Sequence, residues 1–294
     1  MIDKKSNTAG FILVLLSTIF WGMSFISTKI VLTEVPPVSI AFFRQVIALV
    51  PLFLWAFFSK TSLKIALKDF FLLAFSCFFG IVLYFVFENN GLKYTSASNA
   101  SMIVASVPVF TLLAEVLFFR FKANLKMLLC ITVSITGVYL VISINGRLDF
   151  SSARFLGNAM VLGAMISWVI YTILSRNLGT KYSSLVITIY QTAISLFLFI
   201  PFIIPESGNW KGVTLVPLLN LLYLGIFCSA LSYFFFLYGI KKLGATVSST
   251  FLNLIPVVSV IAGYIILGER LGIIQLAGMS LIIGSLWLLN NKLI

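Results

Sequence analysis

The stretch GLKYTSASNASMIVASVP, residues Gly91 to Pro108, decides the fold because the chain contains a second version of it. The second version is GIKKLGATVSSTFLNLIP, residues Gly239 to Pro256, which has the same length. Lys93, Ala97 and Ser101 recur without a gap as Lys241, Ala245 and Ser249. Self-similarity at a fixed offset is the sequence signature of an internal repeat, so the rest of the chain should be duplicated too.

Matches outside this stretch extend the repeat over most of the chain. Trp21 aligns with Trp168 and Gln45 with Gln191, at nearly the same offset. The polar stretch NGRLDFSSAR, residues Asn145 to Arg154, is then the predicted linker between two repeats, 10–144 and 154–290.

The composition identifies an integral membrane protein. Of 294 residues, 61% are hydrophobic and only 10% are charged, against about 25% charged in soluble domains. The net charge of +12 comes from Lys and Arg in short gaps between apolar runs, where such residues set topology, so we expect no nucleic-acid partner. The three cysteines have no metal-ligand spacing and the chain has no His, so we expect no metal site and no cofactor.

Ten apolar runs are each long enough for a helix that crosses a bilayer of about 30 Å. Continuous apolarity without alternation disfavours membrane strands. An odd number of helices per repeat makes the second repeat enter the membrane upside down. The sequence therefore predicts an all-α membrane protein with ten transmembrane helices in two inverted five-helix repeats. The expected spans are 10–32, 38–58, 69–93, 96–119, 124–144, 154–177, 183–204, 216–240, 245–268 and 271–290.

The loop charges predict the orientation. With both termini in the cytoplasm, thirteen Lys and Arg residues fall inside and six outside, while Arg44 lies within a helix. Because basic residues are enriched in cytoplasmic loops, we expect a multi-pass protein of the cell (cytoplasmic) membrane with both termini in the cytoplasm.

The residues resemble a known family. The ten runs, FWGMSF near the start, the two Gly-to-Pro stretches and LGERL at Leu267 to Leu271 resemble EamA-type members of the drug/metabolite transporter superfamily. The first repeat departs from this pattern, because FFRFK at Phe118 to Lys122 lacks the glutamate. The resemblance implies a secondary transporter, often an exporter of amino acids or other small metabolites, with a central cavity between the halves.

Charged residues inside the bilayer are candidates for function because each needs a partner or an aqueous cavity. Arg44, Glu88 and Asn99 fall at one expected depth, whereas the equivalent positions in the second repeat are apolar or aromatic. We expect Arg44 and Glu88 to pair near the cavity, with Asn89 and Asn99 offering hydrogen bonds and Glu88 as the candidate proton carrier. The alternatives are an ion pair that only fixes helix packing, or an Arg that extends to the interface.

Two further sets of residues are candidates. Pro108 and Pro256 should kink their helices at or just before each proline and serve as symmetry-related hinges, unless they only bend a well-packed pair. Glu115 is expected in an ion pair near Arg120 and Lys122, with a coupling role as the alternative. Aromatic and hydroxyl residues are expected to line the cavity, with tight helix packing as the alternative: Trp21, Ser24, Tyr84, Trp168, Tyr171, Ser232, Tyr233 and Asn253.

The predicted function is transport of a small amphipathic metabolite by alternating access, with the proton as candidate coupling ion and the bilayer as surroundings. A lipid flippase and a membrane scaffold are alternatives. A membrane-embedded enzyme is another, although the acidic residues are scattered singly rather than clustered as metal-dependent transferases need. Substrate, direction and oligomeric state stay open.

Overall fold

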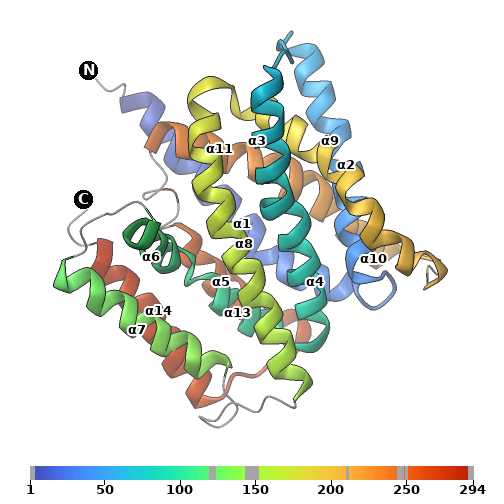
Figure 1. The fold of residues 1–294 in the computed structure, drawn as a ribbon. Coiled ribbons are helices and arrows are strands. Elements are labelled where there is room, and N and C mark those ends of the chain that lie inside the picture. The colour runs from blue at the N-terminus through green and yellow to red at the C-terminus, as the bar shows by residue number, and fades with distance from the viewer. Residues whose placement is uncertain are drawn as a thin grey trace.

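The computed structural model describes residues 4–118, 124–142, 152–209, 212–243, 248 and 251–290, and these form helices joined by short turns (Figure 1). The first half contains α1 (Lys4–Val31), α2 (Pro37–Phe58), α3 (Leu67–Cys77), η1 (Phe78–Leu83), α4 (Tyr84–Tyr94), α5 (Ala97–Val104), α6 (Val107–Phe118) and α7 (Leu125–Ile142). The second contains α8 (Ala153–Lys181), α9 (Ser184–Ile203), η2 (Ile204–Asn209), α10 (Leu215–Tyr223), η3 (Leu224–Leu231), α11 (Ser232–Leu243), η4 (Phe251–Asn253), α13 (Leu254–Leu267) and α14 (Ile273–Asn290). The predicted linker lies mostly outside the described residues.

The described helices form ten rods, five in each half, so the predicted fold class is confirmed. Six rods are long and apolar enough to cross a membrane, and four shorter apolar helices accompany them. Large apolar side chains point outward, with Phe57 78% and Ile273 86% exposed. Such exposure suits a surface that faces lipid rather than water. The chain is a multi-pass membrane protein with two inverted five-helix repeats.

The two halves interleave instead of standing side by side. α2 packs on its counterpart α9, α5 on α13, and α7 on α14, the last pair lying at the edge of the molecule in Figure 1. α4 of the first half packs on α8 of the second, and α11 of the second packs on α1 of the first. This reciprocal pairing is what an inverted repeat produces, and it leaves both halves lining one centre.

The glycine that opens each repeated stretch allows one of these crossings. A Cβ on Gly91 would stand 2.8 Å from the Gly157 carbonyl oxygen of α8, and a Cβ on Gly239 would overlap Val14 of α1. Small residues permit close approach of membrane helices. The repeated glycine therefore sets how tightly α4 and α11 cross the helices of the opposite half.

Both prolines follow an interruption of the helix. α5 ends at Val104 and α6 begins at Val107, immediately before Pro108. The short η4 ends at Asn253 and α13 begins at Leu254, two residues before Pro256. Proline lacks the N–H that would continue the ladder, which accounts for a break at both sites. The hinge role of these breaks stays a prediction, and the Pro108 side chain lies outside the described set.

Two π-helical segments at equivalent places were not expected from the sequence. η1 joins α3 to α4 in the first half, and η3 joins α10 to α11 in the second. A π-helix frees main-chain carbonyls and is frequent at functional sites. Tyr84 and Tyr233, both candidates for the cavity, lie just after these segments.

Two glutamates of the second half each bind a helix N-terminus of the first half. Glu206 accepts hydrogen bonds from the backbone N–H of Val38 (3.0 Å) and Ser39 (2.7 Å) and from the Ser39 hydroxyl (2.8 Å). Glu269 accepts from the N–H of Ala97 (2.9 Å) and Ser98 (3.0 Å) and from the Ser98 hydroxyl (2.6 Å). We call these two contacts the clasps, and the side of the molecule where they lie the clasped face. Each joins the halves through free N–H groups that favour an anion.

The turn that carries Glu269 explains the LGERL motif. Gly268 has a φ of 65°, a conformation that favours glycine, and the N–H of Glu269 donates to the Gly263 carbonyl at 3.1 Å. A Cβ on Gly263 would stand 2.9 Å from the Glu269 carboxylate. Two glycines thus fold this carboxylate back against α5.

A third glutamate, Glu34, makes a related contact at the start of α10. It accepts from the backbone N–H of Thr214 at 2.7 Å and from its hydroxyl at 2.6 Å. These hydrogen bonds hold the pKa of Glu34 below its ordinary value. At the opposite face, Asp69 of α3 binds Lys181 and the hydroxyl of Tyr182, each at 2.8 Å.

Candidate functional site

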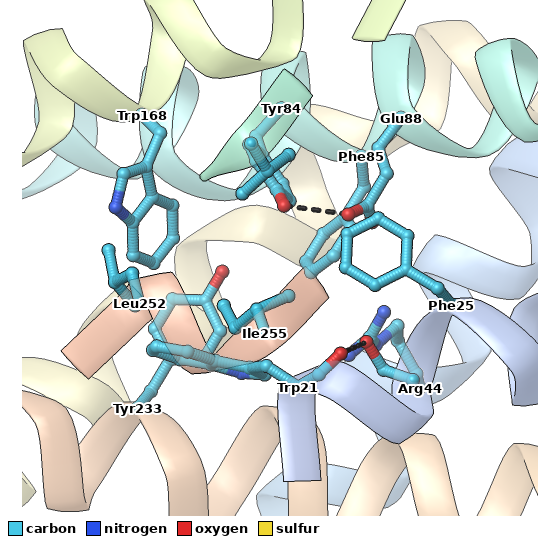
Figure 2. A pocket seen from close by; sticks show the side chains of 12 residues that line it. Trp21, Phe25, Arg44, Tyr84, Phe85, Glu88, Trp168, Tyr233, Leu252 and Ile255 are labelled. Atoms are coloured by element: carbon cyan, nitrogen blue, oxygen red, sulfur yellow. Dashed lines mark hydrogen bonds between the residues drawn. The ribbon is translucent and has the colours of Figure 1, made fainter. Parts of the chain in front are cut away.

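A small cavity lies at the centre of the molecule, between the two halves, with about 30 Å³ of space for the centre of a water molecule (Figure 2). Its walls come from α1, α2, α4, α5, α8, α11, η4 and α13, so both halves contribute. The side chains that line it are Trp21, Ser24, Phe25, Arg44, Tyr84, Phe85, Glu88, Val104, Trp168, Tyr233, Leu252 and Ile255.

One part of the wall is a cluster of aromatic rings contributed by both halves. The ring centre of Trp21 lies 5.5 Å from Trp168 and 5.6 Å from Tyr233, and that of Trp168 lies 5.3 Å from Tyr84. Such separations are typical of favourable edge-to-face or tilted ring contacts. The cluster gives the cavity an apolar side suited to an aromatic or aliphatic group.

The aromatic wall is held by main-chain carbonyls of the π-helices. The indole N–H of Trp21 donates to the Cys228 carbonyl of η3 at 3.0 Å. The hydroxyl of Tyr233 donates to the Gly80 carbonyl of η1 at 3.1 Å. Each bond joins one half to the π-helix of the other, so the segments that sequence reasoning missed position two of the cavity residues.

The other part of the wall is charged. Arg44 is 1% exposed, its Nε donates to the Ser229 hydroxyl at 2.7 Å, and its guanidinium lies 4.2 Å from the ring centre of Phe85. Glu88 is 4% exposed and accepts a hydrogen bond of 2.6 Å from the Tyr84 hydroxyl. The structure thus places a cation and a carboxylate in the same cavity.

The expected direct pair between Arg44 and Glu88 is wrong. Each makes its hydrogen bond to a neutral hydroxyl, and neither is within ion-pair distance of the other. Figure 2 shows the rings of Phe25 and Phe85 between the two charged groups. Sequence depth placed the two residues at one level, but it did not show that Phe85 covers the guanidinium.

Seven of the predicted site residues line the cavity together: Trp21, Ser24, Arg44, Tyr84, Glu88, Trp168 and Tyr233. Tyr171 instead packs behind Trp168, with 5.0 Å between ring centres, and the Ser232 hydroxyl donates to the Phe227 carbonyl. Asn99 is buried on α5 and is absent from the lining. Asn89 donates to the Pro37 carbonyl at 2.8 Å and so fixes α4 to α2. The side chains of Asn253 and Glu115 lie outside the described residues.

Sequence reasoning missed several lining residues. Phe25, Phe85, Val104, Leu252 and Ile255 are apolar and look like any other membrane-helix position. Ser229, which holds Arg44, carries no motif either. Only the helix faces found in the structure separate these residues from lipid-facing ones. Within the described part of the chain, no group of three potential metal ligands occurs.

Comparison with known proteins places the chain in context. The model of the EamA-like transporter family matches residues 8–143 and again residues 155–291. An uncharacterized transporter of Archaeoglobus fulgidus is 30% identical over 285 residues, which cover 94% of this chain and 97% of that protein. The uncharacterized transporter YvbV of Bacillus subtilis is 30% identical over 292 residues, covering 98% of this chain and 93% of that one. A solved crystal structure is similar in fold, with a TM-score of 0.66, 15% identity and coverage of 98% and 96% of the two chains.

Proposed function

Because this chain belongs to the EamA-like transporter family, we propose that it is a secondary-active exporter of small amphipathic metabolites, such as amino acids. The coarser statement, that it is a membrane transporter, rests on the family and on the relatives of the same description. The finer proposal rests on the cavity and on the contacts that close one face.

The observation that carries the proposal is the central cavity shared by two inverted halves. Binding sites of transporters built from inverted repeats lie near the bilayer midplane at the interface of the repeats. The cavity has an aromatic side around Trp21 and Trp168 and a charged side with Arg44 and Glu88. A solute with one apolar and one polar end matches both sides.

Alternating access requires that contacts between the halves break at one face while they hold at the other. The clasps of Glu206 and Glu269 tie the halves together at one face, and Asp69 with Lys181 and Tyr182 joins them at the opposite face. The excess of basic residues in the opposite loops supports the proposal that the clasped face lies outside and both termini lie in the cytoplasm. An exporter would then keep the clasps made while it collects its solute from the cytoplasm, and break them to release the solute outside.

Glu88 supplies a candidate for proton coupling. It is the carboxylate among the residues that line the cavity, and it shares its hydrogen bond with a neutral tyrosine instead of a cation. A buried carboxylate in a membrane transporter marks a path for ions or protons. Binding of solute and binding of a proton at Glu88 would then exclude one another within one small space.

Flux measurements in proteoliposomes test this function. Vesicles loaded with a labelled amino-acid mixture should release it faster than protein-free vesicles. Val104→Trp, which fills the cavity, should abolish the excess, whereas Leu128→Trp on the exposed face of α7 should not. Release that survives Val104→Trp would count against the cavity as the path.

Lipid movement and chemistry are tested in the same vesicles. Bleaching of a fluorescent lipid by a membrane-impermeant reductant reports scrambling, and mass spectrometry of the contents reports any conversion of the solutes. Scrambling without solute release would favour a lipid flippase, and converted solutes would favour a membrane-embedded enzyme.

A further inference from the structure

Arg44 has donors that no group within the described residues uses. Its Nε donates a hydrogen bond to the Ser229 hydroxyl, and Phe85 covers a face of the guanidinium. Arginine carries five N–H donors in a planar fork, so the four on the two Nη atoms remain. Within the described residues, no Asp or Glu oxygen lies within 4.0 Å of this side chain.

These donors face the cavity and are not buried against protein. Arg44 lines the cavity, and none of its nitrogen atoms is both fully buried and without a hydrogen-bond partner. A side chain that is only 1% exposed and keeps its charge needs a counter-charge, since an uncompensated buried ion is strongly unfavourable. Glu88 lines the same cavity but lies beyond ion-pair distance, so a direct counter-charge for Arg44 would come from what enters the cavity.

We propose that Arg44 determines specificity by binding the carboxylate of the transported solute through its two Nη atoms. This assignment rests on the proposed function, because it takes the bound carboxylate to belong to a solute that the protein transports. With Nε held by Ser229 and one face against Phe85, the end of the fork is the edge left for a planar oxyanion. Two parallel N–H···O bonds to a carboxylate fit that edge.

A carboxylate fits better than a phosphate for reasons of charge. A single guanidinium stands at this end of the cavity, and Glu88, the other charged group in the lining, would repel a second negative charge. A phosphate monoester carries about two charges near neutral pH and usually recruits several cations. The aromatic cluster of Trp21 and Trp168 then receives the apolar part of the solute.

The internal repeat shows that the fold does not need a cation here. The position equivalent to Arg44 in the second half is Tyr190, whose hydroxyl donates to the Leu63 carbonyl at 2.6 Å. Helix α9 thus packs with a neutral side chain where α2 has an arginine. A specific task in the first half accounts for this difference better than packing does.

Binding of matched probes tests the inference on the purified full chain in detergent. Phenylpropanoate, phenylpropanol and phenylpropylamine share one skeleton and differ in the end group, and 2-phenylethylphosphonate replaces the carboxylate by a phosphorus oxyanion. Hexanoate, hexanol and hexylamine repeat the comparison without the ring. Quenching of tryptophan fluorescence reports binding, because Trp21 and Trp168 line the cavity.

We expect both carboxylates to bind roughly tenfold more tightly than the matching alcohols and amines, and 2-phenylethylphosphonate to bind more weakly than phenylpropanoate. Arg44→Gln should weaken carboxylate binding by roughly tenfold to a hundredfold without changing alcohol binding, and Arg44→Lys should keep part of it. Lys93→Gln removes the same charge from a residue outside the lining and should have no effect.

Equal or tighter binding of the amines, tighter binding of the phosphonate, or carboxylate binding that Arg44→Gln leaves unchanged would each overturn the inference. Comparison of the probes on the unaltered protein decides the matter even if Arg44→Gln does not fold. Failure of the proposed function is distinguishable: carboxylate binding that depends on Arg44 in a protein without flux would refute transport and keep the site. Flux of cationic solutes that does not need Arg44 would support transport and refute the carboxylate site.

Discussion

Removing the glutamates of the clasps should open the clasped face. Glu206→Gln and Glu269→Gln keep the shape of the side chain but replace the carboxylate by a neutral amide with one acceptor oxygen. Each glutamate accepts three hydrogen bonds, two of them from backbone N–H groups at a helix N-terminus. The closed state should lose stability relative to the open state, where these bonds are not made.

The size of the effect can be worked from the contacts. A hydrogen bond to a charged group contributes about 1.5–3 kcal/mol, and the charge at a helix N-terminus about 0.3–1 kcal/mol. Both glutamates are half-buried, and the amide keeps one acceptor oxygen. We therefore expect each substitution to cost the closed state about 1.4 kcal/mol, which changes the equilibrium between the closed and open states tenfold. The clasps hold different helices, so the double variant should shift it by about a hundredfold.

The assay is labelling of a cavity residue from the clasped face. Ser24→Cys is placed in the cavity of a chain whose three native cysteines are replaced by alanine, in vesicles of defined orientation. A membrane-impermeant thiol reagent should react about ten times faster in either single variant. Asp69→Asn, which removes a carboxylate at the opposite face, should not accelerate labelling. Unchanged rates in the double variant would refute the role of the clasps.

Two further measurements sharpen this test. Gly263→Ala should accelerate labelling without removing a charge, because its Cβ would stand 2.9 Å from the Glu269 carboxylate and 3.0 Å from the Ser98 hydroxyl.

The contact of Glu34 with Thr214 should depend on pH in a defined way. Because its pKa is lowered, the contribution of Glu34 is present above its ordinary value of 4.5 and is lost only as the pH falls through the lowered value. Any effect of Glu34→Gln on labelling should therefore be the same in neutral and mildly acidic buffer.

Three other changes have defined outcomes. Glu88→Gln should remove the response of solute flux to an imposed pH gradient while folding is kept, and flux that still follows the gradient would exclude Glu88 as the proton carrier. Pro108→Ala and Pro256→Ala should shift cavity labelling from the two faces in opposite directions, and shifts of the same sign would contradict paired hinges. Gly80→Ala should lower the free energy of unfolding by about 1–3 kcal/mol, because its Cβ would overlap the ring of Tyr171. Gly284→Ala, which has open space around it, should have little effect in the same thermal melts.

The sequence was sufficient to predict the architecture, because length, hydropathy and an odd helix count per repeat act over the whole chain. Lys93, Ala97 and Ser101 located the repeat, and proline chemistry placed the interruptions before Pro108 and Pro256. The π-helices were not predictable, since one extra residue in a turn leaves no periodic signal in an apolar run.

The site was predicted only in part, because the rotation of a helix decides which side chains meet. Arg44 and Glu88 do share the cavity, but the ring of Phe85 covers the arginine, and sequence depth contains no information on that. The role of Glu269 was missed although LGERL was noticed. Its signal was the glycine before the glutamate, which turns the chain back toward the N-terminus of α5.

The bonds from Trp21 and Tyr233 to the Cys228 and Gly80 carbonyls have a consequence for how such proteins diverge. Every residue type offers the same main-chain oxygen, so the amino acid at position 228 can change without loss of the bond that orients the indole. A cavity wall held by such main-chain bonds keeps its geometry while the residues around it are substituted. Relatives that share less than a third of their residues can then inherit one frame and adapt it to different solutes by ordinary point substitution.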